Sequence, residues 1–141
     1  MTDDGFAWLE QDHRNIEEQF QTFLRDNEEP VVRELCEHLT RHSHTEDAAL
    51  YPTLRRYVDG GDDLADRAQQ EHATIATMVA ELFQSTTPDR LVDQVSQLQE
   101  IVSAHVEFEE SEVFPEMRSC GVDGDQLLRD LREADAREPS L

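Results

Sequence analysis

Two stretches of this sequence repeat one pattern of histidine and acidic residues, and the repeat restricts the folds open to the chain. Residues 42–52 and 105–115 align without gaps, each reading His, three residues, Glu, a second acid, and then an aliphatic residue, an aromatic residue and Pro. Upstream of each stretch, at His13 and His72, a histidine follows an acid and precedes an isoleucine by three residues. The repeat therefore predicts two helical hairpins of one design.

Apolar residues recur every three or four positions along most of the chain, as they do in amphipathic helices. Glycines and prolines interrupt this periodicity at only a few places, which we take as helix boundaries. The expected helices cover about 5–25, 30–58, 62–84 and 88–118, followed by a short tail helix at about 123–134. We predict a single all-α domain over 1–141: an antiparallel up-down-up-down four-helix bundle with a short C-terminal helix.

Each predicted helix has a polar side chain within its apolar stripe. A histidine or glutamate that faces the core of a bundle must be paired, hydrogen-bonded or bound to a metal. The residues that interrupt the stripes are His13, His42, Glu46, His72, His105 and Glu109. Because the two hairpins follow one pattern, a bundle with pseudo-twofold symmetry brings all of them to the same level of the core.

These side chains are suitable ligands for a metal. A histidine and a glutamate four residues apart share one helix face, so each His-x-x-x-Glu pair can reach a common centre. Imidazoles and carboxylates suit iron, manganese or zinc. If both glutamates bridge two ions, each ion has two nitrogen and two oxygen ligands. A bridging oxo or hydroxo group would supply a fifth ligand to each ion, and the sixth position of each would stay open. Redox use of the open positions favours two non-haem iron ions as cofactors.

On these residues the chain resembles the hemerythrin-like family, also called the HHE cation-binding domain. The resemblance covers residues 6–118 and rests on His13, His42-x-x-x-Glu46, His72 and His105-x-x-x-Glu109 in the order that the family uses. It implies a non-haem di-iron centre inside the bundle. It also implies a role in O2 binding, oxygen or redox sensing, iron handling, or reaction with peroxide or NO.

The chain departs from the oxygen carriers of that family at one position. These carriers have a fifth histidine one turn after the ligand on the third helix, and this chain has Ala76 there. Their coordination is asymmetric, with one iron filled and one open, which suits reversible O2 binding. With an open position on each ion, reaction with peroxide, O2 or NO is expected in place of simple O2 carriage.

Two further residues are candidates for an additional ligand. Tyr51 lies five residues after Glu46 and would ordinarily be off the ligand face of the helix. Pro52 removes a backbone hydrogen bond, however, and can distort this turn so that the phenol reaches the metal. His38 lies one turn before His42 and can point at the same layer.

Other side chains with reactive groups are assigned to the surface or the core. Asp47, Glu107 and Glu110 are expected at the solvated surface, with a hydrogen bond to a ligating imidazole as the alternative. Cys36 and Cys120 are too far apart in the sequence to suggest a thiolate metal site, and we expect both to be reduced.

The charge of the chain excludes several classes of partner. All 12 basic residues are arginine, against 33 acids, and the net charge is −21. Such a charge repels phosphate backbones and anionic lipids, so we expect no nucleic acid or membrane partner. The absence of lysine excludes a P-loop or Schiff-base lysine. The N-terminus has no basic segment or apolar run of signal-peptide type, so a cytoplasmic location is expected.

The leading hypothesis is a di-iron protein that binds or reacts with a small oxidant, namely peroxide, O2 or NO. As an enzyme it would decompose peroxide in a catalase-like way or act as an oxidoreductase on NO or O2, with no catalytic residue beyond the metal ligands. The alternative is a binding protein that senses O2 or iron, or stores iron, without turnover. A third hypothesis is a metal-free helical adaptor, whose melting temperature a chelator would leave unchanged.

Overall fold

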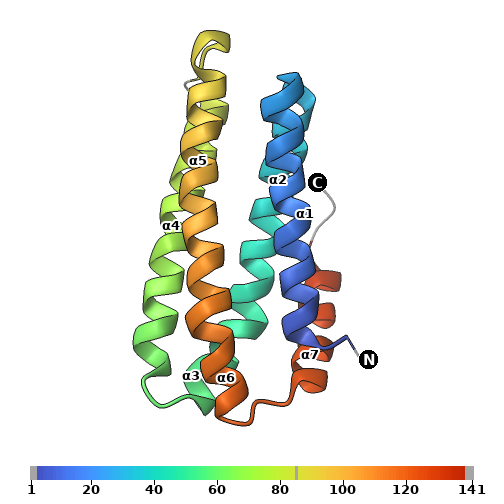
Figure 1. The fold of residues 1–141 in the computed structure, drawn as a ribbon, viewed down its shortest axis with the longest axis vertical. Coiled ribbons are helices and arrows are strands. Elements are labelled where there is room, and N and C mark those ends of the chain that lie inside the picture. Colours follow the sequence, from blue (N-terminus) through green and yellow to red (C-terminus); the bar gives the residue numbers. More distant parts are fainter. Residues whose placement is uncertain (1–2, 85, 139–141) are drawn as a thin grey trace.

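The structure, a computed structural model, describes residues 3–84 and 86–138, and these form a bundle of antiparallel helical rods (Figure 1). The first rod is α1 (Gly5–Asp26), and the second consists of α2 (Glu29–Thr45), η1 (Glu46–Leu50) and α3 (Tyr51–Tyr57). The third rod is α4 (Gly61–Gln84), and the fourth consists of α5 (Pro88–Phe108), η2 (Glu109–Val113) and α6 (Phe114–Ser119). The short C-terminal helix is α7 (Gly124–Arg137). The predicted all-helical bundle is confirmed for the described residues.

Local sequence determines where several helices begin and end. The side chain of Asp4 accepts a hydrogen bond from the Ala7 N–H at 3.0 Å and caps the start of α1. Asn27 ends this helix in the left-handed conformation, with φ of 55°. Asp123 caps α7 in the same way as Asp4 caps α1. These ends lie within a few residues of those predicted from the sequence.

The second and fourth rods each contain a π-helical turn, where uninterrupted helices were expected over about 30–58 and 88–118. In η1 the Tyr51 N–H bonds to the Glu46 carbonyl five residues back, and in η2 the Phe114 N–H bonds to that of Glu109. The proline after each aromatic residue has no N–H to continue an α-helical ladder, which favours the wider turn. In the second rod the wider turn is followed by Tyr51, whose hydroxyl lies 3.2 Å from Glu46 Oε1, and in the fourth rod it is followed by Phe114, whose ring stacks on His13.

The core consists of two apolar clusters with a polar layer between them. The first cluster, at the end of the bundle near α7, includes Leu9 of α1 and Ala68 of α4. The second, towards the opposite end, includes Ile16 and Ile75 of the same two helices. His13 and His72 fall between these positions in the sequence, so the polar layer lies where the clusters meet.

Helix α7 packs along the lower part of α1 and against the second rod (Figure 1). The approach is close, because a Cβ on Gly5 of α1 would lie 2.5 Å from Leu127 Cγ of α7. Arg41 of α2 also binds Asp135 of α7, with 2.7 Å between Nε and Oδ1. Among the described residues, we find no helix with the length and apolar character needed to span a membrane.

Candidate metal centre

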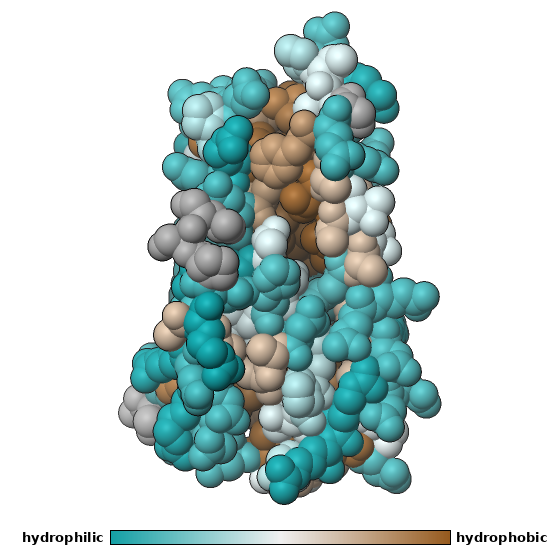
Figure 2. All heavy atoms as spheres, turned by 180° about the vertical axis from the view of Figure 1, so that it is seen from behind, coloured by the Kyte–Doolittle hydropathy of each residue, from teal (hydrophilic) through white to brown (hydrophobic). Residues whose placement is uncertain are grey.

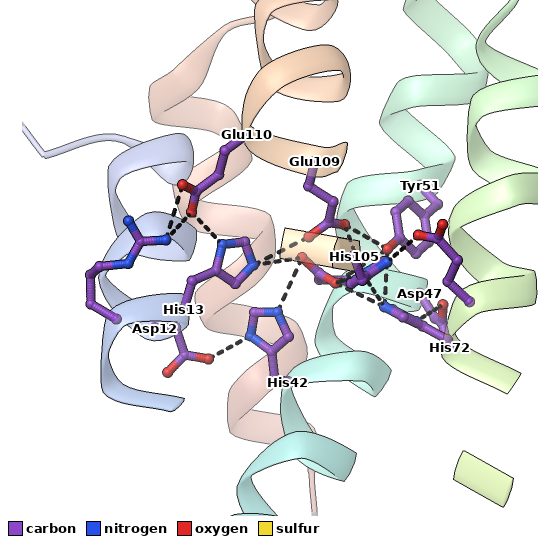
Figure 3. Close-up of polar contacts among 12 residues, drawn as sticks. Asp12, His13, His42, Asp47, Tyr51, His72, His105, Glu109 and Glu110 are labelled. Carbon is purple, nitrogen blue, oxygen red and sulfur yellow. Dashed lines mark hydrogen bonds and ion pairs between the residues drawn. The ribbon is translucent and has the colours of Figure 1, made fainter. Parts of the chain in front are cut away.

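All the residues that interrupt the apolar stripes meet in the polar layer, as the close-up in Figure 3 shows for those it labels. Each rod supplies one histidine, and the two π-helical turns supply the glutamates. None of these side chains is more than 6% exposed: His13, His42, Glu46, His72, His105 and Glu109. The structure therefore brings together every residue that the sequence proposed as a main metal ligand.

The residues form two groups of four, and both carboxylates belong to both groups. One group is His13 and His42 with Glu46 and Glu109. The other is His72 and His105 with the same two glutamates. Within each group, one ligand atom per residue lies within 4.8 Å of all the others. Each group has the donors and the spacing to hold one cation.

Each carboxylate directs one oxygen to each group. For Glu46, Oε2 lies 3.2 Å from His42 Nε2 and Oε1 lies 3.0 Å from His72 Nε2. For Glu109, Oε1 lies 3.2 Å from His13 Nε2 and Oε2 lies 3.5 Å from His105 Nε2. Each carboxylate therefore offers one oxygen to each of the two groups.

The ring nitrogens and carboxylate oxygens that face the inside of the polar layer have few hydrogen-bond partners in the protein itself. Four of them are buried without a partner of hydrogen-bond geometry among the described residues: His13 Nε2, His42 Nε2, Glu46 Oε2 and Glu109 Oε1. In the other group, His72 Nε2 and His105 Nε2 lie only 3.0 Å apart. Buried polar atoms without partners are costly, and a cation would satisfy all of these at once. The donor set therefore fits a bound metal.

Outside the centre, each histidine is held by an acidic side chain at its other ring nitrogen. The Nδ1 partners are Glu110 for His13 at 2.7 Å, Asp12 for His42 at 2.5 Å, Asp47 for His72 at 3.1 Å and Glu71 for His105 at 2.7 Å. A carboxylate that accepts the Nδ1 hydrogen fixes the ring orientation and leaves Nε2 directed at the metal position. This is the arrangement that ligating histidines require.

Two of these acids correct an expectation from the sequence. Asp47 and Glu110 were expected at the solvated surface, with a hydrogen bond to a ligating imidazole as the alternative. Their side chains are 40% and 22% exposed, and each binds an imidazole, so the alternative holds. Glu107 is exposed, as expected. Asp12 and Glu71 were not singled out for this role. The sequence pattern that could have indicated it is that each of these acids directly precedes a histidine, in one half of the repeat and in the other.

Tyr51 makes the two halves of the centre unequal. Its side chain is fully buried, and its hydroxyl donates to Glu109 Oε2 at 2.6 Å and lies 3.1 Å from His72 Nε2. The residue at the same place in the repeat is Phe114, whose ring stacks on His13 with 6.2 Å between centroids and 3° between planes. The half with His72 thus has one more oxygen than the half with His13.

His38 lies outside both groups. Its Nε2 is 2.7 Å from Asp12 Oδ1, and its Nδ1 is 2.6 Å from Gln19 Oε1. The structure therefore places this residue one step behind His42, in contact with the acid that holds that ligand.

The buried carboxylates change the acidity of the imidazoles. Burial alone would lower the pKa of His42, but the nearby charge of Glu46 and the hydrogen bond to Asp12 outweigh it and raise this pKa to about 9. The same balance between burial and nearby carboxylates raises the pKa of His72 and of His105 to about 9. A metal that binds these imidazoles must displace their protons.

The fold and the site define a class of protein: a helical bundle that holds metal cations in a buried centre of imidazoles and carboxylates. The chain belongs to the hemerythrin HHE cation-binding domain family, which matches residues 4–117. A DNA nickase from Nostoc sp. (strain PCC 7120) is 28% identical over 117 residues, which cover 79% of this chain. The match covers 32% of that relative, so the chain spans about a third of its length. No solved structure matches the chain.

Proposed function

We propose that this protein binds two non-haem iron ions and that the di-iron centre reacts with a small oxidant, namely peroxide, O2 or NO. The observation that carries the proposal is that two ligand groups share both carboxylates, with one oxygen of each directed at each group. The donors would also suit manganese or zinc. Bound iron supplies the change of oxidation state and the coordination positions that reaction with an oxidant needs.

The protein residues hold the ions and control their surroundings. His13 and His42 would hold one ion, His72 and His105 would hold the other, and Glu46 and Glu109 would contribute an oxygen to each. The acids on Nδ1 keep each ring in the binding orientation. Buried aromatic side chains such as Phe114 exclude bulk water from the layer.

Of the two candidates for an additional ligand, we retain Tyr51. Its hydroxyl oxygen is in contact with Glu46, His72 and Glu109, and the π-helical turn holds it there. For Tyr51 to bind a metal ion, its Oη would have to lose the proton that it now donates to Glu109. Both ring nitrogens of His38 are bonded to other side chains, so this residue is proposed to support Asp12 instead.

The proposed partner is a small molecule and not a nucleic acid. The net charge of −21 opposes the phosphate backbone, whose binding depends on positive side chains. We therefore do not carry DNA nicking over from the relative, of which the match covers 32%.

The deciding experiment is the metal content of protein purified without chelator, measured together with its ultraviolet-visible spectrum. About two irons per chain with ligand-to-iron charge-transfer bands are expected, in agreement with two groups of ligands. Protein grown in iron-replete medium that carries no iron, or one zinc ion, would overturn the proposal. Repeated consumption of peroxide per centre then identifies an enzyme, whereas a single change identifies a sensor or a store.

A further inference from the structure

A cavity of about 270 Å³ opens between α2 and α4 and reaches the outer edge of His72. We call it the α2–α4 groove, and its lining includes Leu39, Asp47, Gln69, His72, Ile75, Ala76 and Val79. Figure 2 shows this face of the molecule, where apolar side chains lie in a depression between two hydrophilic ridges. The groove therefore joins the surface to a residue of the metal centre.

The groove exists because the two helices that line it are not closely packed. α2 and α4 pack against each other less closely than α1 packs against α2 or α4 packs against α5. Ala76 of α4 adds only a methyl group one turn after His72, and its position is exposed. Side chains on a helix lean towards its N-terminus, so a larger residue here would cover the surface over His72.

The α4 side of the lining changes from polar to apolar along the groove, from Gln69 and His72 to Ile75 and Val79, whereas the α2 side carries polar groups from Thr40 to Asp47. Since α2 and α4 run antiparallel, Asp47 and Gln69 lie at one end, beside His72. Leu39 and Val79 lie at the other end, next to the second apolar cluster. An occupant that satisfies both ends has an apolar body and one polar end.

The groove is larger than a molecule such as O2 or hydrogen peroxide needs. A water molecule takes about 30 Å³ of liquid volume, and O2 or hydrogen peroxide is little larger. The cavity of about 270 Å³ holds several times that volume and approaches the lower range of pockets for small organic ligands.

We propose that the α2–α4 groove binds a small organic molecule with an apolar body and a polar end, and that its occupant in the iron-loaded protein is an organic hydroperoxide. The identity of the occupant rests on the proposed function, while binding in the groove does not. The alkyl group lies against Leu39, Ile75 and Val79, and the hydroperoxide end lies beside Asp47 and His72. The groove thus selects organic hydroperoxides over hydrogen peroxide.

The first test uses protein without metal and an unreactive analogue, tert-butyl alcohol. Titration is followed by methyl NMR of Leu39, Ile75 and Val79, with the methyl groups of Leu127 of α7 as the internal reference. We expect saturable shifts confined to the groove, and an Ala76→Phe substitution should weaken binding at least about tenfold. Ala136→Phe, at an exposed site on α7, is the matched control and should leave binding unchanged. Shifts spread over the whole protein, or binding that survives Ala76→Phe, would overturn the proposal.

The second test uses iron-loaded protein and follows the rate of its spectral change after mixing with peroxide. Ala76→Phe is expected to slow the change caused by tert-butyl hydroperoxide at least about tenfold and the change caused by hydrogen peroxide less than about twofold. Equal slowing of both, or of neither, would rule out selection by the groove. If the protein takes up no iron, the proposed function fails, and the alcohol titration still decides whether the groove is a binding site.

Discussion

Tyr51 donates a hydrogen bond to Glu109 Oε2 at 2.6 Å, although the two residues come from opposite halves of the repeat. The tyrosine follows the first π-helical turn, and the glutamate begins the second. Since the counterpart of Tyr51 is Phe114, this contact has no equivalent on the other side of the centre. The pseudo-symmetric bundle therefore contains an asymmetric site, in which one of the two shared carboxylates accepts a hydrogen bond from a phenol.

The role of Tyr51 can be tested by removing its hydroxyl. If the phenolate binds iron, the ferric protein has a visible phenolate-to-iron band that Tyr51→Phe abolishes while about two irons remain bound. In protein stripped of metal, the lost hydrogen bond to Glu109 should cost about 1 to 3 kcal/mol of unfolding free energy. Tyr57→Phe is the control, because Tyr57 is 53% exposed. A band that persists in Tyr51→Phe would refute ligation by this residue.

The sharing of carboxylates predicts unequal effects of ligand substitutions. Glu109→Ala removes a ligand from both groups, so it should abolish stable binding of both ions. His42→Ala removes a ligand from one group only and should leave about one tightly bound ion per chain. Metal content after gel filtration distinguishes the two variants. The same loss in both would mean that the sites do not fill independently.

The acids behind the imidazoles should affect metal affinity without contacting the metal. Glu110→Gln weakens the acceptor of the His13 Nδ1 hydrogen and should lower iron affinity about 10- to 100-fold. Competition with a calibrated chelator measures this change. Glu107→Gln, at an exposed position in the same segment, should change affinity less than about twofold. Equal effects of the two substitutions would argue for a general charge effect instead.

The stability of protein stripped of metal should fall as pH rises above neutrality. The pKa of His42, His72 and His105 is raised to about 9 in the folded chain, against 6.5 as the ordinary value. A raised pKa contributes stability that is complete below about 6.5 and is lost as pH rises towards 9. Thermal unfolding between pH 6 and pH 9.5 measures the trend. The metal-loaded protein should vary less over this range, and a stability that rises with pH in stripped protein would contradict the assignment.

The two cysteines should differ in reactivity. Burial, together with the charge of Glu37, raises the pKa of Cys36 to about 11, so its thiol is protonated and shielded at pH 8. Cys120 is exposed. A disulfide reagent should therefore modify one thiol per chain rapidly in native protein and the second only after unfolding. In Cys120→Ser the rapid phase should disappear, and if it remained, Cys36 would be the accessible thiol.

Much of the architecture could be predicted from the sequence because it depends on local patterns. The apolar period, the prolines and glycines, and caps such as Asp4 act within a few residues, so helix positions follow from the chain alone. The six main ligand residues were also identifiable. A histidine or glutamate in an apolar stripe is costly unless something binds it, and the repeat marked the same positions twice.

The π-helical turns could only be anticipated in part. Pro52 indicated a distortion, but a missing N–H does not determine whether the helix kinks, breaks or widens. The wider turn depends on the surrounding core, which buries Tyr51 completely and places it over Glu46. Phe114 follows an equivalent π-helical turn in the other half of the repeat. Only the folded site shows the consequence of this difference between the two aromatic residues, which is a hydroxyl group in one half of the centre and none in the other.

The sequence by itself determined the helices, the ligand types and their repeat, since these are properties of spacing along one helix. Only the tertiary structure decided which acid holds which histidine, as Asp47 and Glu110 each reach across to the other half of the repeat. It also placed His38 behind Asp12 and opened the α2–α4 groove at Ala76. These features depend on how far apart the helices pack and how each is rotated about its axis. Both are determined jointly by side chains from different hairpins.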